Sequence, residues 1–247
     1  MDGAGGGRVR PCLRGVVRSR EVRRVVTGPN EDVRPVPAPF ADIEAVAAAH
    51  RRLTERIGDL SDDAVRKASL LPGWTVGHVL THLARNADSH VRRADAAAAG
   101  VVVDQYPGGY EARAAEIEVG ASRPAREIVD DVGRSALALD RKWRETAEDA
   151  WSAISVDVGG RQRQLRELPA RRWQEVEVHL VDLDIGVTHR AWSGDFVSVW
   201  LPRTRDQISE KLEPGAALPH LDDPRDELAW LYGRLRRDDL RSLPAWG

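Results

Sequence analysis

Residues 71–88, LPGWTVGHVLTHLARNAD, contain the pattern from which the fold is predicted. The Pro-Gly pair favours a turn, and Thr75 can cap a helix because its hydroxyl accepts a hydrogen bond from a backbone N–H of the first turn. Apolar residues then recur every three or four positions, at Val76, Val79, Leu80, Leu83, Ala87 and Val91. Because this spacing places them on one side of a helix, the stretch predicts a turn followed by an amphipathic helix.

Helical spacing continues on both sides of this stretch. One helix is expected from about Asp42 to the stop at Gly58, and Ser122, with Glu127, is expected to open the longest helix. A short turn capped by Ser61 is predicted through Lys67, and shorter helices are predicted around residues 110–119, 195–212 and 223–236. The sequence therefore predicts a mainly α protein with at least four amphipathic helices in its first two thirds.

Two segments alternate in hydropathy. Residues 151–168 alternate up to a Gly-Gly pair, which predicts a small hairpin or an irregular loop. Residues 175–183 alternate too, but apolar residues from Trp173 to Val187 also follow helical steps, and Pro169 stands where the start of a helix tolerates proline. We therefore expect a helix at residues 175–183.

The composition divides the chain into three parts. Residues 1–40 contain eight arginines and four acidic residues, a net charge of +4, together with many glycines and prolines. Such a segment buries too little apolar area to offset its chain entropy, so a disordered tail is expected. The alternative is a basic arm for nucleic acid, but the remaining chain then has a net charge of −2 − 4 = −6 and would repel phosphate. We expect a bundle at 41–190, a short end segment at 191–247 and no nucleic-acid partner.

Several classes of protein are excluded by the sequence. Cys12 is the single cysteine, so no internal disulfide and no cysteine metal cluster can form. No apolar run is long enough to span a membrane, and the N-terminus lacks the apolar middle of a signal peptide, so a soluble cytoplasmic protein is expected. The sequence also lacks a glycine-rich phosphate loop, a G-x-S-x-G elbow and an H-E-x-x-H pair.

Two pairs of residues have the spacing of metal ligands. His78 and His82 are four residues apart on one predicted helix, and Glu175 and His179 are four apart on another. Because residues four apart share a helix face, each pair could give two ligands to one ion. Two histidines and one carboxylate would leave a position open, as catalytic zinc sites do. The alternative is structural: His78 and His82 would be hydrogen-bonded histidines beside an apolar stripe, and Glu175 a solvated helix residue.

Several motifs, separated along the chain, resemble those of one protein family. They are residues 71–88, Tyr106-Pro107-Gly108-Gly109 with Arg113 and Glu116-Ile117-Glu118, the stretch 172–183 (RWQEVEVHLVDL), the stretch 228–234 (LAWLYGR) and Leu243-Pro244-Ala245-Trp246. In this order they resemble the mycothiol-dependent maleylpyruvate isomerases of the DinB superfamily. The resemblance covers most of residues 42–247 and implies a DinB-like metal-binding four-helix bundle.

The resemblance also implies a site and a reaction. It places the metal ligands of the family, with zinc as the expected ion, on His82, Glu175 and His179. Arg234 matches an arginine that holds substrate carboxylates, and Arg113 is a weaker candidate for the same role. The implied cofactor is mycothiol, a small thiol of actinobacteria, which would add to the cis double bond of maleylpyruvate and leave after the bond has rotated, giving fumarylpyruvate. Because Cys12 lies in the predicted tail, the reactive sulfur would come from mycothiol.

The chain differs from the family pattern in its last part. After the helix at residues 175–183 only about sixty residues remain, without an alternating apolar strand, so we expect a shortened and mostly helical C-terminal region. This difference leaves the substrate open. The first hypothesis is the isomerase, the second a mycothiol S-transferase for another electrophile, and the third a non-catalytic metal-binding bundle.

Overall fold

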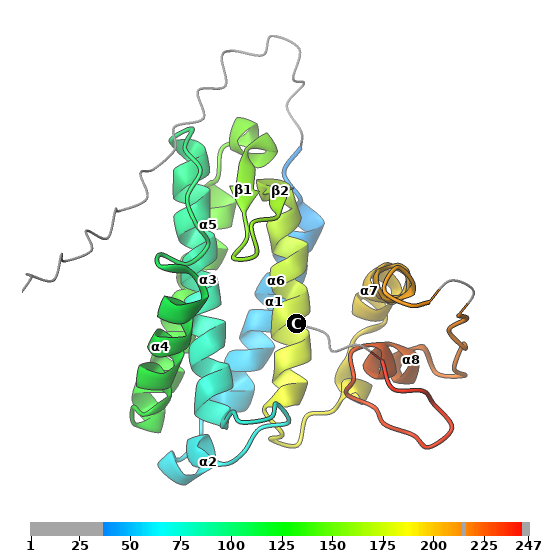
Figure 1. The fold of residues 1–247 in the computed structure, drawn as a ribbon. Helices are drawn as coiled ribbons and strands as arrows, with labels where there is room; N and C mark the ends of the chain where they lie inside the picture. The colour runs from blue at the N-terminus through cyan, green and yellow to red at the C-terminus, as the bar shows by residue number, and fades with distance from the viewer. Residues whose placement is uncertain (1–36, 214–215, 244–247) are drawn as a thin grey trace, which may run out of the picture.

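Four long helices lie side by side in the computed structural model, which describes residues 37–213 and 216–243. The helices are α1 (Phe40–Ile57), α3 (Val76–Ala98), α5 (Ala125–Glu145) and α6 (Leu168–Asp182) (Figure 1). α3 packs against α5, and α1 packs against both α5 and α6. The predicted fold class is confirmed: the described chain is mainly α, a four-helix bundle with a short, mostly helical C-terminal segment. No helix among the described residues has the length and apolarity that crossing a membrane requires.

The first turn of α3 forms as its local sequence predicts. The Thr75 hydroxyl accepts a hydrogen bond from the backbone N–H of His78, and the His78 ring accepts one from the backbone N–H of Thr75. These reciprocal bonds satisfy two donors that the start of a helix would otherwise leave unpaired. The predicted stripe of α3, from Val76 to Ala87, is buried in the bundle core.

A polar network joins the four helices inside this apolar core. Asp140 of α5 accepts from His50 Nδ1 of α1 at 2.8 Å, and His50 Nε2 accepts from Arg172 Nε of α6 at 3.1 Å. Arg172, which is fully buried, also donates to Asn86 Oδ1 and to the Leu83 carbonyl of α3, both at 2.9 Å. Because a buried polar group needs its partners, the network restricts how the helices align.

The start of α5 differs from the prediction. Ser122 does not open α5; it lies at the end of α4 (Gly109–Ala121), and its hydroxyl donates to Val119 O. α5 begins at Ala125, whose backbone N–H donates to Asp62 Oδ1 of α2 (Asp62–Arg66) at 2.6 Å. The cap therefore comes from another element, 63 residues away. The longest helix is α3, with 23 residues against 21 in α5.

A hairpin lies beside one end of the bundle, as the alternating pattern predicts. Strands β1 (Ile154–Val156) and β2 (Gln162–Gln164) pair in antiparallel fashion, between the short 3₁₀ helices η1 (Glu148–Ser152) and η2 (Leu165–Glu167). The turn between the strands contains Gly160, whose φ of 82° is unfavourable for other residues. The hairpin contacts α3 through β1 and η1.

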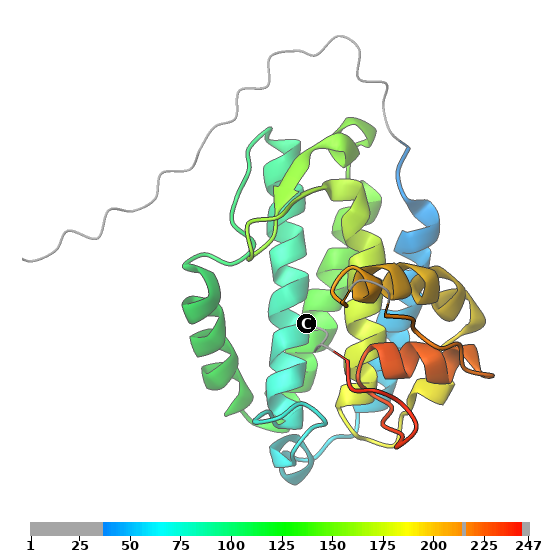
Figure 2. The same ribbon diagram turned by 45° about the vertical axis from the view of Figure 1, so that its right-hand side comes forward.

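The C-terminal segment packs against the bundle beside α6 (Figure 2). It contains η3 (His189–Ala191), α7 (Gly194–Ser209) and α8 (Pro224–Leu231). Trp192 and Phe196 are buried in the bundle core, and Trp192 Nε1 donates to the Glu177 carbonyl of α6 at 3.0 Å. α8 ends five residues before the predicted boundary because Gly233, with φ of 73°, turns the chain. The described part of this segment contains no strand.

The predicted tail lies mostly outside the described residues. Residues 1–36, which include Cys12, are not described, and neither are 214–215 and 244–247. The division of the chain at residues 40 and 190 stays a prediction.

Candidate metal centre and the adjoining cavity

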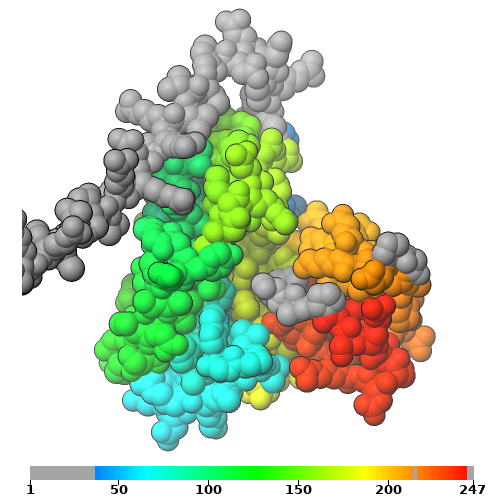
Figure 3. All heavy atoms as spheres, viewed as in Figure 1, coloured from blue at the N-terminus to red at the C-terminus, as the bar shows by residue number. Residues whose placement is uncertain are grey.

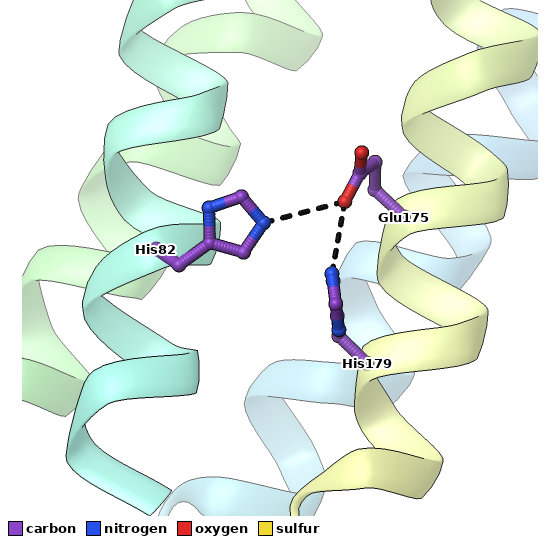
Figure 4. A group of neighbouring side chains, drawn as sticks. All are labelled: His82, Glu175 and His179. Carbon is purple, nitrogen blue, oxygen red and sulfur yellow. Dashed lines mark hydrogen bonds and ion pairs between the residues drawn. The ribbon is translucent and has the colours of Figure 1, made fainter. Parts of the chain in front are cut away.

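Three side chains converge between α3 and α6. His82 comes from the middle of α3, while Glu175 and His179 lie one turn apart on the facing side of α6 (Figure 4). Glu175 Oε2 lies 3.3 Å from His82 Nε2 and 3.0 Å from His179 Nε2. The two imidazole rings meet edge to face, with centroids 4.9 Å apart.

The spacing of these atoms suits a tetrahedral cation. Each residue offers one ligand atom, and the three atoms all lie within 4.8 Å of one another. In a tetrahedral zinc site with bonds of about 2.0–2.1 Å, two ligand atoms are roughly 3.3 Å apart. The donor set, two imidazoles and one carboxylate, is that of catalytic zinc sites with an open position. The residues present therefore fit a divalent cation.

Burial and mutual contacts determine the protonation of the three groups. Burial alone would raise the pKa of the Glu175 carboxyl, but hydrogen bonds with His179 and His82 hold it well below its usual value. Burial lowers the pKa of His82 to about 4, so its imidazole is neutral near pH 7. Burial would also lower the pKa of His179, but hydrogen bonds to Asp182 and Glu175 raise it. The ionised carboxylate of Glu175 suits a cation, and the raised pKa of His179 means that proton release from this ring accompanies cation binding over a wider range of pH.

Asp182 and Arg234 orient His179. The ring Nδ1 of His179 lies 2.8 Å from Asp182 Oδ2, which leaves Nε2 facing Glu175. Asp182 is fully buried and accepts two hydrogen bonds from Arg234, from Nε at 2.8 Å and from Nη2 at 2.7 Å. Such a carboxylate contact fixes the tautomer and the ring orientation of a metal-binding histidine.

The neighbours of His82 are an arginine and a tryptophan. Arg113 Nη2 donates to His82 Nδ1 at 2.9 Å, and the Trp74 ring lies 5.7 Å from the His82 ring, centroid to centroid. His78 is not part of this group: its Nδ1 takes part in the cap of α3, and its Nε2 lies 3.3 Å from Glu118 Oε2. The two histidines of α3, His78 and His82, therefore separate into one capping residue and one candidate ligand.

A cavity of about 690 Å³ extends from this centre toward the hairpin. Its walls come from α3, α4, α6 and the hairpin, with Arg234 and Gln207 from the C-terminal segment. In Figure 3 the hollow lies between green α4, the yellow-green hairpin and the orange and red C-terminal segment. Its lining is cationic, because six arginines line it against Asp157 and Glu175: Arg93, Arg113, Arg161, Arg163, Arg171 and Arg234. Such a cavity favours anionic ligands.

Comparison with known proteins identifies the family. The family model of the mycothiol maleylpyruvate isomerase N-terminal domain matches residues 46–184, which span α1 to the end of α6 and include the three converging side chains. The chain belongs to this family. In this member of the mycothiol maleylpyruvate isomerase family, the segment after residue 184 lies outside the matched N-terminal domain.

Two solved structures share the fold of this family member. A crystal structure of the mycothiol-dependent maleylpyruvate isomerase gives a TM-score of 0.75 at 23% identity, covering 85% of this chain and 98% of that chain. A crystal structure of a histidine-to-alanine mutant of the mycothiol-dependent maleylpyruvate isomerase gives 0.75 at 22% identity, with the same coverage. The comparison with curated proteins gives no match.

The structure places the five predicted site residues of this family member in two groups, three converging side chains and two arginines beside them. His82, Glu175 and His179 form the converging group, and their assignment as metal ligands stays a prediction. Arg113 lies against His82, whereas Arg234 lies against Asp182, and both line the cavity. Their assignment to substrate carboxylates also stays a prediction.

Sequence reasoning missed three residues around the site. Asp182 follows His179 by three positions, so it shares the helix face, and this spacing could have indicated it. His90 and Arg93 continue the face of α3 that begins with His82 and Asn86, in steps of four, four and three residues. That periodicity was available in the sequence, but it coincides with the apolar stripe of the same helix.

Proposed function

We propose that this chain is a mycothiol-dependent cis–trans isomerase of maleylpyruvate type, assisted by a divalent cation, with zinc as the expected ion. In this reaction the cis double bond takes up the thiol of mycothiol, the resulting single bond rotates, and elimination returns the thiol and the trans isomer. The observation that supports the proposal most is the convergence of His82, Glu175 and His179 at the end of an arginine-rich cavity, in a member of the mycothiol maleylpyruvate isomerase family.

His82, Glu175 and His179 would hold the cation through Nε2, Oε2 and Nε2. A zinc ion bound there would lower the pKa of an approaching thiol, so that thiolate is present near neutral pH. Asp182 keeps the proton of His179 on Nδ1, which reserves Nε2 for coordination. Trp74, whose ring lies beside that of His82, lines this end of the cavity.

Arg113 and Arg234 are proposed to hold the substrate carboxylates. A histidine that coordinates through Nε2 carries its proton on Nδ1, so His82 could then no longer accept the hydrogen bond from Arg113. The Arg113 guanidinium would turn from His82 to a carboxylate of the substrate, which it can bind in bidentate fashion. Arg234 lines the same cavity, where its guanidinium, oriented by Asp182, would bind a second substrate carboxylate and stabilise the negative charge that develops during thiol addition.

An activity assay with matched variants tests the proposal. The zinc-loaded full chain should convert maleylpyruvate to fumarylpyruvate with mycothiol present and without net loss of thiol. His82→Ala and Glu175→Gln should lower kcat/KM by roughly 100-fold or more, because each removes a ligand of the ion. His220→Gln, an exposed histidine outside the cavity, is the control and should keep full activity. Absence of turnover with zinc and mycothiol supplied would refute the isomerase proposal.

A mycothiol S-transferase is the second candidate, because the cavity extends well beyond the candidate metal centre to the hairpin. It would use the same three residues on another electrophile. Stoichiometric loss of mycothiol, with a stable thioether product, would select the transferase over the isomerase. A non-catalytic bundle predicts no turnover with any thiol, and His82→Ala would then change stability alone.

A further inference from the structure

The end of the cavity remote from the metal centre is lined by arginines from three elements. Arg93 lies on α3, eleven residues beyond His82, which corresponds to about 16 Å along the helix axis. Arg171 lies on α6, four residues before Glu175 and eight before His179, or about 6 and 12 Å along the helix axis. Arg163 lies on β2 of the hairpin. These side chains therefore form a second cationic region, separated from the candidate metal ligands.

Arg93 is a buried cation without an anionic hydrogen-bond partner. Arg93 is 3% exposed. Its Nε donates to the Ser155 hydroxyl, and its Nη2 has no partner among the described residues. Burial lowers the pKa of Arg93 to about 10, so the guanidinium is still charged near pH 7. Buried charges in proteins are normally paired, because an uncompensated one is costly. The nearby Asp157 raises this pKa and so offsets part of the charge, but no described carboxylate accepts a hydrogen bond from Arg93 where it lines the cavity.

His90 adds a second unpartnered group to the same wall. It lies one turn before Arg93 on α3, is 3% exposed, and its Nδ1 has no partner among the described residues. Burial holds the pKa of His90 well below its usual value, so the ring is neutral and can donate one hydrogen bond. His90 and Arg93 both line the cavity and each has a ring or guanidinium nitrogen without a partner among the described residues, so a ligand in the cavity could supply one.

The carboxylates nearby only partly balance the arginines. Arg163 lies 3.6 Å from Asp157 and 3.8 Å from Glu167, both longer than a hydrogen bond. Burial lowers the pKa of Arg171, and the positive charge of the nearby Arg163 lowers it further, whereas Glu167 and Asp157 raise it. An anion between Arg93, Arg163 and Arg171 would relieve this repulsion.

We propose that Arg93, Arg163 and Arg171, with His90, form a binding site for an oxyanion, a carboxylate or phosphate group at the far end of a cavity ligand. The site does not depend on the cation. If the proposed function is right for the reacting end, it follows that the electrophile carries an anionic group that reaches toward Arg93, about 16 Å along α3 from His82. Such a substrate would be an elongated relative of maleylpyruvate, with the same reacting end and an additional anionic group.

Binding of small oxyanions to the metal-free full chain tests the site. Inorganic phosphate and acetate are titrated separately into ¹⁵N-labelled protein, and the arginine Nε–H signals are followed by NMR; the Arg93 signal is the one absent from Arg93→Lys. Saturable shifts of this signal are expected, and the ion that binds more tightly identifies the oxyanion. Arg171→Gln should weaken binding by about tenfold or more, because it removes a charged donor. Arg163→Gln should act in the same way and serves as the second variant.

Arg126→Gln is the matched control, since this side chain on α5 is 93% exposed and lies outside the cavity. It should bind phosphate as the unaltered chain does. The site is refuted if phosphate and acetate leave the Arg93 signal unchanged, or if Arg171→Gln and Arg163→Gln bind both ions with unchanged affinity. Failure of the isomerase assay would leave this result untouched, because neither zinc nor mycothiol is present.

The zinc-loaded chain tests the length of the ligand. Linear dicarboxylates of increasing length are titrated by calorimetry. Those long enough to reach from the ion to Arg93 should bind about tenfold or more tightly than succinate, and Arg171→Gln should abolish this preference. Equal affinities across the series would refute the elongated substrate.

Discussion

Asp182 decides how His179 is presented, although it is not a candidate ligand itself. It lies between His179 Nδ1 and the Arg234 guanidinium, and all three side chains are almost completely buried. Burial would raise the pKa of Asp182, but hydrogen bonds with Arg234 and His179 lower it, so the carboxylate stays ionised. This arrangement makes the basicity of His179 depend on a residue that does not approach the ion.

Asp182→Asn should therefore weaken zinc binding by about 10- to 100-fold, the effect seen when the carboxylate partner of a metal-binding histidine is removed. The measurement is competition with a chelating indicator at constant pH. Asp226→Asn is the matched control, because Asp226 accepts from His189 at 2.7 Å in the same kind of pair, away from the cavity. If the two variants bind zinc equally well, Asp182 has no role in positioning the ligand.

At the scale of elements, the N-terminus of α5 is capped by a side chain from another helix and not by a residue of its own sequence. The N-cap residue is Pro124, which has no side-chain acceptor, and Asp62 of α2 supplies the oxygen instead. We expect Asp62→Ala to lower the free energy of unfolding by about 1 kcal/mol, within the range of 0.5–2 kcal/mol for lost caps. Urea denaturation followed by circular dichroism measures this change.

Asp63→Ala is the control for the cap. Asp63 is adjacent to Asp62 and exposed in the same turn of α2, so its replacement should cost only a few tenths of a kcal/mol. Equal losses for the two variants would mean that the charge of this turn matters, rather than the hydrogen bond to Ala125.

The two helix starts show which parts of the fold the sequence could predict. α3 was predictable because Thr75 and His78 lie within one turn of each other. The start of α5 was not, because its acceptor is 63 residues away and only the packed bundle brings it close. The site follows the same division. Helical spacing alone pairs Glu175 with His179, but the choice of His82 over His78 required the family resemblance.

At the scale of the whole molecule, Arg172 joins three helices and should contribute strongly to stability. Arg172→Met keeps much of the side-chain volume but leaves acceptors on His50, Asn86 and Leu83 without their donor. Because each buried unsatisfied group costs about 1–3 kcal/mol, we expect a loss of about 2–5 kcal/mol in the free energy of unfolding. Arg126→Met, on the exposed face of α5, should change it by less than about 0.5 kcal/mol. A similar small effect of Arg172→Met would mean that the network contributes little to stability.

The buried histidines also predict how the stability of the metal-free protein depends on pH. Burial lowers the pKa of His82 to about 4, and it lowers those of His50 and His90 as well. Below the unfolded pKa of about 6.5 the unfolded chain binds protons at these positions and the folded chain does not, so folding loses stability as the pH falls.

Two other groups act on the same equilibrium. The raised pKa of His179 works in the opposite direction, because its contribution is present below about pH 6.5 and is lost as the pH rises through its folded pKa. The lowered pKa of Glu175 adds a loss below its unfolded pKa of about 4.5. Because the contribution of His179 is already complete below about pH 6.5, the three lowered histidines determine the slope, so the free energy of unfolding should decrease from pH 6.5 to pH 4.5 and fall further below that. Urea denaturation of chelator-treated protein at half-unit intervals measures the slope, and stability that is constant or rises toward pH 4.5 would contradict the neutral state of these three rings.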